Sequence, residues 1–145
     1  MRAVVQRVTH GKVSVDGHSI AEIGPGLVIL LGIGPNDDEE KARSLGRKIA
    51  LLRIFADAEG KMNRSCVDIS GQAIVVSQFT LYADTRRGNR PSFIEAAPPD
   101  LARPLCDRFS QLLIEAGIPT QQGEFGANMR VQIENDGPVT ILFEI

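Results

Sequence analysis

Two short segments of this sequence carry polar side chains at places where a ligand could meet them. The first is SQFTL, residues 77–81, which ends the apolar run that begins at Ala73. The second is NDGPVT, residues 135–140, which lies between an alternating segment that starts at Met129 and an apolar run that ends at Phe143. These two segments are the first candidates for binding and catalysis.

The hydroxyl groups of SQFTL give weak support for a nucleophilic mechanism. A serine or threonine needs a base beside it, and the sequence has just two histidines, both near its N-terminus and without an acidic partner in a recognisable motif. Ser77 lacks the flanking glycines of a nucleophile elbow, so a hydrogen bond at a strand end is its simpler role. If a hydroxyl attacks, Thr80 is the better candidate, because in an alternating strand it shares a face with Gln78 while Phe79 points to the opposite face.

Metal and thiol chemistry are not indicated by the residue pattern. The acidic run at residues 37–40 stands where a helix would begin, a place that favours carboxylates for structural reasons, and no histidine or cysteine accompanies it. Cys66 and Cys106 are isolated, without the spacing of a metal site, and are expected to be reduced and buried in an intracellular protein. We therefore expect no metal site, no cofactor and no disulfide.

The hydrophobic pattern predicts strands and two amphipathic helices that would position these segments. A capped acidic turn at residues 36–40 begins a helix with apolar residues at helical spacing as far as Leu52, and a Pro-Pro-Asp sequence at 98–100 begins a second helix that ends before Gly117. Strand patterns occupy residues 3–9, 12–15, 19–23, 27–33, 53–55, 73–81, a segment near 121, 129–134 and 139–143. These elements predict an α+β fold with a mixed, mainly antiparallel, barrel-like sheet.

Gly137-Pro138 interrupts what otherwise has the pattern of a β-hairpin at the end of the chain. The strands at 129–134 and 139–143 flank an Asn-Asp-Gly turn signal, but the proline removes a backbone donor where the second strand should begin. A bond before proline also takes the cis form in about 5–6% of cases in folded proteins. From these residues alone, a trans proline that closes the hairpin is the expected state.

Length and composition predict one domain, residues 1–145, with an ordinary hydrophobic core. Hydrophobic residues make up 43% of the chain. The longest apolar run, Leu27 to Ile33, is far shorter than the ~20 residues that span a bilayer. The N-terminus lacks the layout of a signal peptide, so we expect a cytoplasmic protein without membrane contact.

The formal net charge of −2 argues against a protein that coats nucleic acid, because such binding neutralises many phosphates. An acidic protein can still hold the end of an RNA. Two basic segments are available for a few phosphates, and solvated loop charge is the alternative role for both. The first contains Arg86, Arg87 and Arg90, and the second contains Lys61 and Arg64.

Together, SQFTL and NDGPVT resemble the signature pair of the D-aminoacyl-tRNA deacylases, which hydrolyse the ester between a D-amino acid and tRNA. The resemblance covers nearly the whole chain in the order of the family. It includes MRAVVQRV (1–8), IGPGLVILLGIG (23–34), LRIFADAEGKMNRS (52–65), GNRPSF (88–93) and GEFGANMRV (123–131). Two departures stand at Gln122, where a threonine is commoner, and at Asn89, where a second basic residue is commoner. They concern the fit of the nucleic acid or the pocket rim and leave the chemistry unchanged.

The resemblance implies a homodimer that needs neither a cofactor nor a metal ion. SQFTL would hold the adenosine and ester end of the substrate through Ser77, Gln78 and backbone N–H groups. Gly137-Pro138, in the cis form, would reach into the pocket of the partner subunit and fix the amino acid. Arg7 would anchor this loop by a hydrogen bond to a backbone carbonyl.

Further residues have expected roles. The resemblance places Phe125 and Met129, which would otherwise be plain core residues, near the substrate pocket. We further expect the backbone N–H of Phe79 or Thr80 to stabilise the oxyanion that develops on the ester. Arg86, Arg87 and Arg90 would contact the tRNA.

The activity implied is hydrolysis of D-aminoacyl-tRNA, and of glycyl-tRNA mischarged on a non-cognate tRNA, to the free amino acid and tRNA. The terminal 2′-hydroxyl of the tRNA is already held within reach of the ester carbonyl, so it would assist the reaction in place of a protein base. A rigid clamp at the α-carbon would exclude L side chains and admit glycine.

Two other functions are consistent with the residues alone. A non-catalytic module that binds an RNA end would explain the lack of a conventional catalytic group. A general esterase would use Ser77 or Thr80 and would cleave simple esters that lack a ribose hydroxyl. Deacylation assays on D-, L- and glycyl-tRNA separate these functions from an editing hydrolase.

Overall fold

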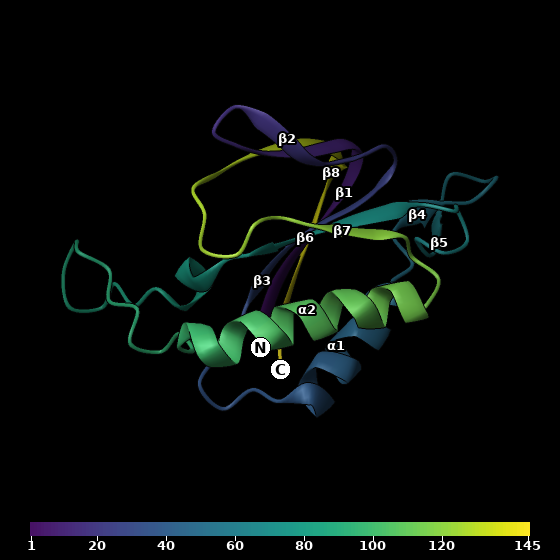
Figure 1. The fold of residues 1–145 in the computed structure, drawn as a ribbon. Coiled ribbons are helices and arrows are strands. Elements are labelled where there is room, and N and C mark those ends of the chain that lie inside the picture. Colours follow the sequence, from purple (N-terminus) through teal and green to yellow (C-terminus); the bar gives the residue numbers. More distant parts are fainter.

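The computed structural model describes residues 1–145 and has a curved main sheet with two helices against one of its faces (Figure 1). The strands are β1 (Arg2–Val15), β2 (His18–Ile23), β3 (Gly26–Gly32), β4 (Phe55–Ala56), β5 (Met62–Arg64), β6 (Gln72–Ser77), β7 (Thr120–Gln122) and β8 (Met129–Glu144). The helices are α1 (Glu39–Ala50), α2 (Pro99–Glu115) and the short 3₁₀ helix η1 (Phe79–Tyr82). The strand expected at residues 53–55 is reduced to β4, which pairs only with β5.

The main sheet is mixed and nearly closes into a barrel, which confirms the predicted α+β class. Its strands follow the order β2-β1-β3-β6-β7, and β8 pairs with β1 as well. β1 is antiparallel to β2, β3 and β8, whereas β6 is parallel to β3 and β7. A side chain joins the edges β2 and β7, because the Gln121 amide donates to the Glu22 carbonyl at 2.7 Å and accepts from the Glu22 N–H at 3.0 Å.

β1 is one strand of 14 residues where the sequence pattern predicts two. It pairs with β3 over residues 2–8 and with β2 over residues 11–15, so the two predicted strands continue into each other. Gly11 lies at this change of partner, and a Cβ there would stand 2.7 Å from Val28 Cγ2. Glycine is therefore required at this position for close approach to β3, and not for a turn.

The predicted C-terminal hairpin is wrong, because both of its strands belong to β8, which pairs with β1 from Met129 to Glu144. The register shifts between Asn135 and Thr140, so residues 136–139 bulge out of the ladder. β1 offers a partner on both sides of this bulge. The turn signal in NDGPVT therefore produces a bulge within one long strand, and the chain does not reverse its direction there.

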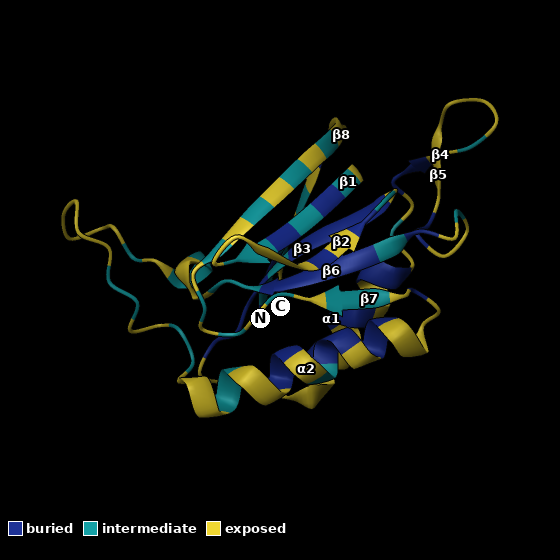
Figure 2. Cartoon of the chain, turned by 45° about the horizontal axis from the view of Figure 1, so that its top comes forward, coloured by how far each residue is buried: buried dark blue, intermediate teal, exposed yellow.

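The two long helices turn their apolar faces toward the sheet, and Figure 2 shows their outer faces exposed. α1 begins at the N-cap Asp38, whose side chain accepts a backbone hydrogen bond, and it buries Leu45 and Ile49. α2 buries Phe109 and Leu113 in the same core. Neither helix combines the length and the apolar composition needed to cross a membrane.

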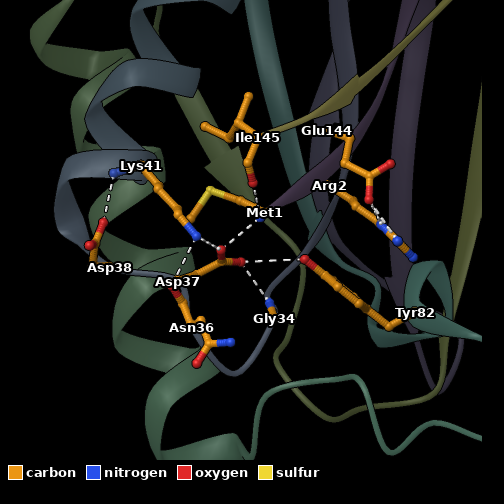
Figure 3. A network of polar contacts seen from close by, with 10 residues as sticks. All are labelled: Met1, Arg2, Gly34, Asn36, Asp37, Asp38, Lys41, Tyr82, Glu144 and Ile145. Atoms are coloured by element: carbon orange, nitrogen blue, oxygen red, sulfur yellow. Dashed lines mark hydrogen bonds and ion pairs between the residues drawn. The ribbon is translucent and has the colours of Figure 1, made fainter.

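The two ends of the chain meet at the buried carboxylate of Asp37, drawn in Figure 3. The Met1 ammonium donates to Asp37 Oδ1 at 2.7 Å and to the Ile145 backbone oxygen at 2.8 Å. The Gly34 N–H and the Lys41 ammonium donate to the same carboxylate at 2.7 and 3.2 Å. Burial raises the pKa of Asp37, but these hydrogen bonds outweigh burial and hold the pKa below its ordinary value. The charged carboxylate thus joins β1 to the segment before α1.

Asp37→Asn should lower the free energy of unfolding at pH 7 by about 3–5 kcal/mol, because it leaves a buried ammonium without its counter-ion. A carboxylate whose pKa is lowered by folding stabilises the protein above its unfolded pKa, and this contribution is lost as the pH falls through the folded value. The difference between wild type and variant should therefore shrink below about pH 4. Urea unfolding followed by circular dichroism at pH 7 and pH 3 measures both effects.

The matched control is Asp16→Asn, which removes the charge of an exposed aspartate in the turn between β1 and β2. It should change the free energy of unfolding little at either pH. A loss in Asp37→Asn that is the same at pH 7 and pH 3 would contradict a role for the charged carboxylate.

Candidate active site

A cavity of about 580 Å³ opens beside the carboxyl end of β6. Thirteen of its 18 lining residues are hydrophobic. The lining comes from the ends of β3 and β6, η1, the segment between η1 and α2, the first half of α2, and the chain between β7 and β8 with the start of β8. Five residues that the sequence singles out line it together, namely Ser77, Gln78, Phe79, Phe125 and Met129. A cavity of this size with a few polar groups suits a small organic ligand.

SQFTL does not continue β6 as the sequence pattern predicts. β6 ends at Ser77, where its parallel pairing with β3 ends opposite Leu31, and the next residues turn into η1. The strand alternation expected for Gln78, Phe79 and Thr80 is therefore wrong. Beyond the end of β3 no strand is left to pair with, so the hydrogen bonds of a 3₁₀ turn replace those of a ladder.

Gln78 and Thr80 meet in spite of this turn, because Gln78 Nε2 donates a hydrogen bond to Thr80 Oγ1. An amide cannot take a proton from a hydroxyl group as a general base does. Thr80 is also exposed and does not line the cavity. The surroundings of this hydroxyl therefore do not activate it as a nucleophile.

Two backbone N–H groups at the start of η1 lack an acceptor in the helix. The Gln78 N–H donates to the Leu31 carbonyl at 2.8 Å, and the Leu81 N–H donates to the Gln78 carbonyl at 3.3 Å. The N–H groups of Phe79 and Thr80 lie between these two and precede the first closed turn. Phe79 lines the cavity, which brings the start of η1 to its edge.

The bulge of β8 presents Gly137-Pro138, and the bond between them is cis, as the resemblance implies. Gly137 has a φ of 121°, which other residues rarely adopt. Both residues are exposed, and no residue from 135 to 140 lines the cavity. A single chain therefore does not bring SQFTL and NDGPVT together.

Arg7 on β1 binds this bulge through its side chain. Its Nε donates to the Asp136 carbonyl at 3.2 Å and pairs with the Asp136 carboxylate at 3.0 Å. Its Nη1 donates to the Ile54 carbonyl at 2.5 Å. On the other side, Asn135 Oδ1 accepts a hydrogen bond from the Val139 N–H at 2.8 Å. The bulge is thus fixed at both of its ends.

Arg86, Arg87 and Arg90 lie on an arm, residues 83–98, which extends from the body of the protein between η1 and α2 (Figure 1). Arg86 forms a bidentate pair with Asp84, with both N–O distances at 2.8 Å. Hydrogen bonds from the Arg86 side chain and N–H lower the pKa of Asp84 to about 2. Arg87 and Arg90 are exposed and outside this pair. The arm therefore offers two free arginines instead of three.

Sequence reasoning missed the lining residues of the arm and α2. Phe93 lies edge-on to Phe79, with ring centroids 5.0 Å apart, and Ala102 and Cys106 line the cavity from α2. The only available signal was an aromatic residue in the polar segment GNRPSF. Burial raises the pKa of the Cys106 thiol to about 12, so this thiol stays neutral and is not a nucleophile at neutral pH.

The acidic run at 37–40 has structural partners. Asp37 binds the ammonium of Met1, Asp38 caps α1, and Glu39 pairs with Arg108 at 3.0 Å. Nowhere in the chain do three or more His, Cys, Asp or Glu side chains gather in a way that could hold a metal ion.

The fold and the cavity together define a small, barrel-like α+β protein with a cavity where two parallel strands end. The family model described as D-Tyr-tRNA(Tyr) deacylase matches residues 4–144. The chain therefore belongs to the D-aminoacyl-tRNA deacylase family, as SQFTL and NDGPVT predict.

Relatives of known name match over the full length. A D-aminoacyl-tRNA deacylase from Roseiflexus castenholzii is 59% identical over 144 residues, which are 99% of this chain and 92% of that protein. One from Carboxydothermus hydrogenoformans is 54% identical over 145 residues, which are 100% of both chains. The solved structure of a c-Myc DNA Unwinding Element Binding Protein has a TM-score of 0.93 at 41% identity and covers 100% of this chain and 99% of its own.

Proposed function

We propose that this protein is a homodimeric hydrolase that cleaves D-aminoacyl-tRNA, and glycyl-tRNA mischarged on a non-cognate tRNA, to the free amino acid and tRNA. Membership of the family supports the aminoacyl-tRNA ester as the substrate. The observation that carries the mechanism is the pair of backbone N–H groups, of Phe79 and Thr80, without an acceptor in η1 at the edge of an apolar cavity.

These two N–H groups donate to the carbonyl oxygen of the ester, where negative charge develops as water adds to the carbonyl carbon. The neighbouring ribose 2′-hydroxyl assists that addition, because neither Ser77 nor Thr80 has a base beside it. Collapse of the intermediate breaks the ester bond, the tRNA 3′-oxygen takes a proton, and the amino acid leaves with a free carboxylate. Apolar walls around Phe125 and Met129 hold the terminal adenosine and keep bulk water out.

Selectivity comes from the Gly137-Pro138 bulge of the partner subunit. The bulge is exposed, is held by Arg7 and Asn135, and does not line the cavity of its own chain, which supports a role in a second copy. A rigid backbone at the substrate α-carbon leaves room for hydrogen and clashes with a side chain in the same position. L-amino acids are therefore excluded and glycine is admitted.

The tRNA is held at its end by few charges. Arg87 and Arg90 are the free cations of the arm, whereas Arg86 serves mainly to brace the arm through Asp84. Since the arm joins η1 to α2 and packs Phe93 on Phe79, phosphate contacts at its tip lie on the same segment as the mouth of the cavity.

Thr80→Ala should slow deacylation by only about 2–13-fold, which corresponds to one hydrogen bond of about 0.5–1.5 kcal/mol. A D-aminoacyl-tRNA without the terminal 2′-hydroxyl should be nearly inert even with wild-type protein. Single-turnover hydrolysis measures both rates, with simple D-amino acid esters as the control for general esterase activity. An inactive Thr80→Ala protein together with an active 2′-deoxy substrate would make Thr80 the nucleophile.

Gly137→Ala should leave the protein folded but reduce the preference for D- over L-aminoacyl-tRNA about tenfold, or ~1.4 kcal/mol. The added Cβ would stand 2.9 Å from Arg7 Nη2 and 2.9 Å from Val139 Cγ2, at a positive φ that alanine disfavours. Rates on D-, L- and glycyl-tRNA give the preference. Gly60→Ala is the control, because Gly60 has a φ of +78° with nothing within 4 Å of the added Cβ. An unchanged preference in Gly137→Ala would exclude the clamp.

The slope of log affinity against log salt should be shallow, roughly −2 to −4, because few phosphates are neutralised. Replacing Arg87 and Arg90 together by alanine should flatten this slope by about 1.4 and leave the D over L preference unchanged. Arg43→Ala on α1 removes one positive charge away from the arm and is the control, which should leave the slope unchanged. Binding of deacylated tRNA at several salt concentrations measures the slope. A slope near −10 would instead indicate a protein that wraps nucleic acid.

A further inference from the structure

η1 carries the two N–H groups of the proposed ester site, yet burial in the core does not fix it. None of its four residues is buried, and Phe79 is 57% exposed. The side chain of the N-cap Gln78 bonds to the Thr80 hydroxyl and caps no backbone N–H of the helix. The position of η1 therefore depends on contacts made by its second half, Leu81 and Tyr82.

Two glycines, Gly32 at the end of β3 and Gly34 just after it, lie against the second half of η1. A Cβ on Gly32 would stand 3.1 Å from the Gln78 carbonyl oxygen and 3.1 Å from Leu81 Cβ. A Cβ on Gly34 would stand 2.8 Å from the Tyr82 hydroxyl oxygen and 3.0 Å from Tyr82 Cζ. A methyl group on Gly32 would require the Gln78 carbonyl or Leu81 to shift by a few tenths of an ångström, and one on Gly34 would push against the Tyr82 ring. The Gly-Ile-Gly sequence at 32–34 therefore lets η1 lie directly on the backbone.

Arg2 of β1 holds the same half of η1. Its guanidinium lies 4.5 Å from the centroid of the Tyr82 ring, and its Nη1 donates to the Leu81 carbonyl at 3.0 Å. Glu144 of β8 accepts from Arg2 Nε at 2.9 Å and from Nη2 at 2.7 Å, and Figure 3 shows this pair beside Tyr82. The guanidinium plane is thus fixed by a carboxylate on a neighbouring strand while it contacts Tyr82.

The hydroxyl of Tyr82 adds a weaker contact. It lies 3.4 Å from Asp37 Oδ2, which is long for a hydrogen bond between oxygens. The same Oδ2 already accepts from the Gly34 N–H at 2.7 Å. The ring of Tyr82, packed on Gly34 and Arg2, therefore contributes more to the position of η1 than its hydroxyl does.

We infer that Arg2, Tyr82, Gly32 and Gly34 are positioning residues for ester hydrolysis: they fix η1 and thereby set the direction of the Phe79 and Thr80 N–H groups. The inference rests on the proposed function, in which these N–H groups contact the ester carbonyl. None of the four residues touches the substrate in this arrangement. A shift of the donors by about 1 Å is enough to slow a reaction about a hundredfold.

Such a role predicts a loss in the rate of the chemical step and not in binding. None of the four residues lines the cavity, and Phe79 is the one residue of η1 that does, so most of the apolar walls stay in place when η1 moves. Tyr82→Leu and Arg2→Ala should therefore lower the maximal single-turnover rate on D-aminoacyl-tRNA about 10- to 100-fold. The enzyme concentration at half-maximal rate should stay within about threefold of wild type.

Conservative and independent variants complete the experiment. Tyr82→Phe keeps the ring and should retain about a third or more of the wild-type rate, since it loses only the long hydroxyl contact. Gly32→Ala disturbs η1 from the side of β3 and should lower the maximal rate about as much as Tyr82→Leu does. Arg43→Ala, an exposed arginine of α1, removes the same charge as Arg2→Ala and should match wild type. All rates are measured at a temperature at which circular dichroism shows every variant folded.

A rate within threefold of wild type in folded Tyr82→Leu, Arg2→Ala and Gly32→Ala would overturn the positioning role while leaving the proposed function intact. An increase in the enzyme concentration at half-maximal rate, with the maximal rate unchanged, would also overturn it, because that result assigns these residues to binding. A wild-type protein that hydrolyses no D-aminoacyl-tRNA would overturn the proposed function and this inference together.

Discussion

The pairing of β1 along both of its edges is the constraint on which the rest of the structure depends. β3 and then β2 occupy one edge, and β8 occupies the other from end to end. A strand held in this way cannot slip, because a shift of one residue would turn its whole inner face outward. Two of its side chains, Arg2 and Arg7, are therefore fixed in place. Arg2 contacts η1 and Arg7 contacts the Gly-Pro bulge, so one strand holds both segments of the proposed site.

The site built on this frame relies on the backbone more than on reactive side chains. The cavity is largely apolar, its thiol is kept neutral by burial, and the hydroxyl of Thr80 meets an amide. In the proposed reaction, the protein offers the backbone N–H groups of η1 and the Gly-Pro bulge held by Arg7. These are the elements that orient a substrate, and they agree with a reaction in which the substrate supplies part of its own chemistry.

The sequence predicts the local features well and the long-range ones poorly. α1 and α2 follow from apolar spacing and end signals, and SQFTL and NDGPVT stand out because polar groups close apolar runs. The single strand β8 is missed because a turn signal is local, whereas pairing with β1 involves residues more than 100 positions away. η1 is missed because its turn depends on where β3 ends. Small residues that line the cavity, such as Ala102, carry no chemical signal in the sequence. No sequence pattern predicts the contact between Asp37 and the Met1 ammonium.

The closure of the barrel by Gln121 has a consequence for the wall of the cavity. The other neighbouring strands of the main sheet are joined by runs of backbone hydrogen bonds, but between β2 and β7 one side-chain amide supplies both the donor and the acceptor. The chain that leaves β7 forms one wall of the cavity, from Phe125 to Met129. The strand that leads into this wall is therefore tied to the barrel by a backbone ladder on its β6 side and by a single glutamine on its β2 side.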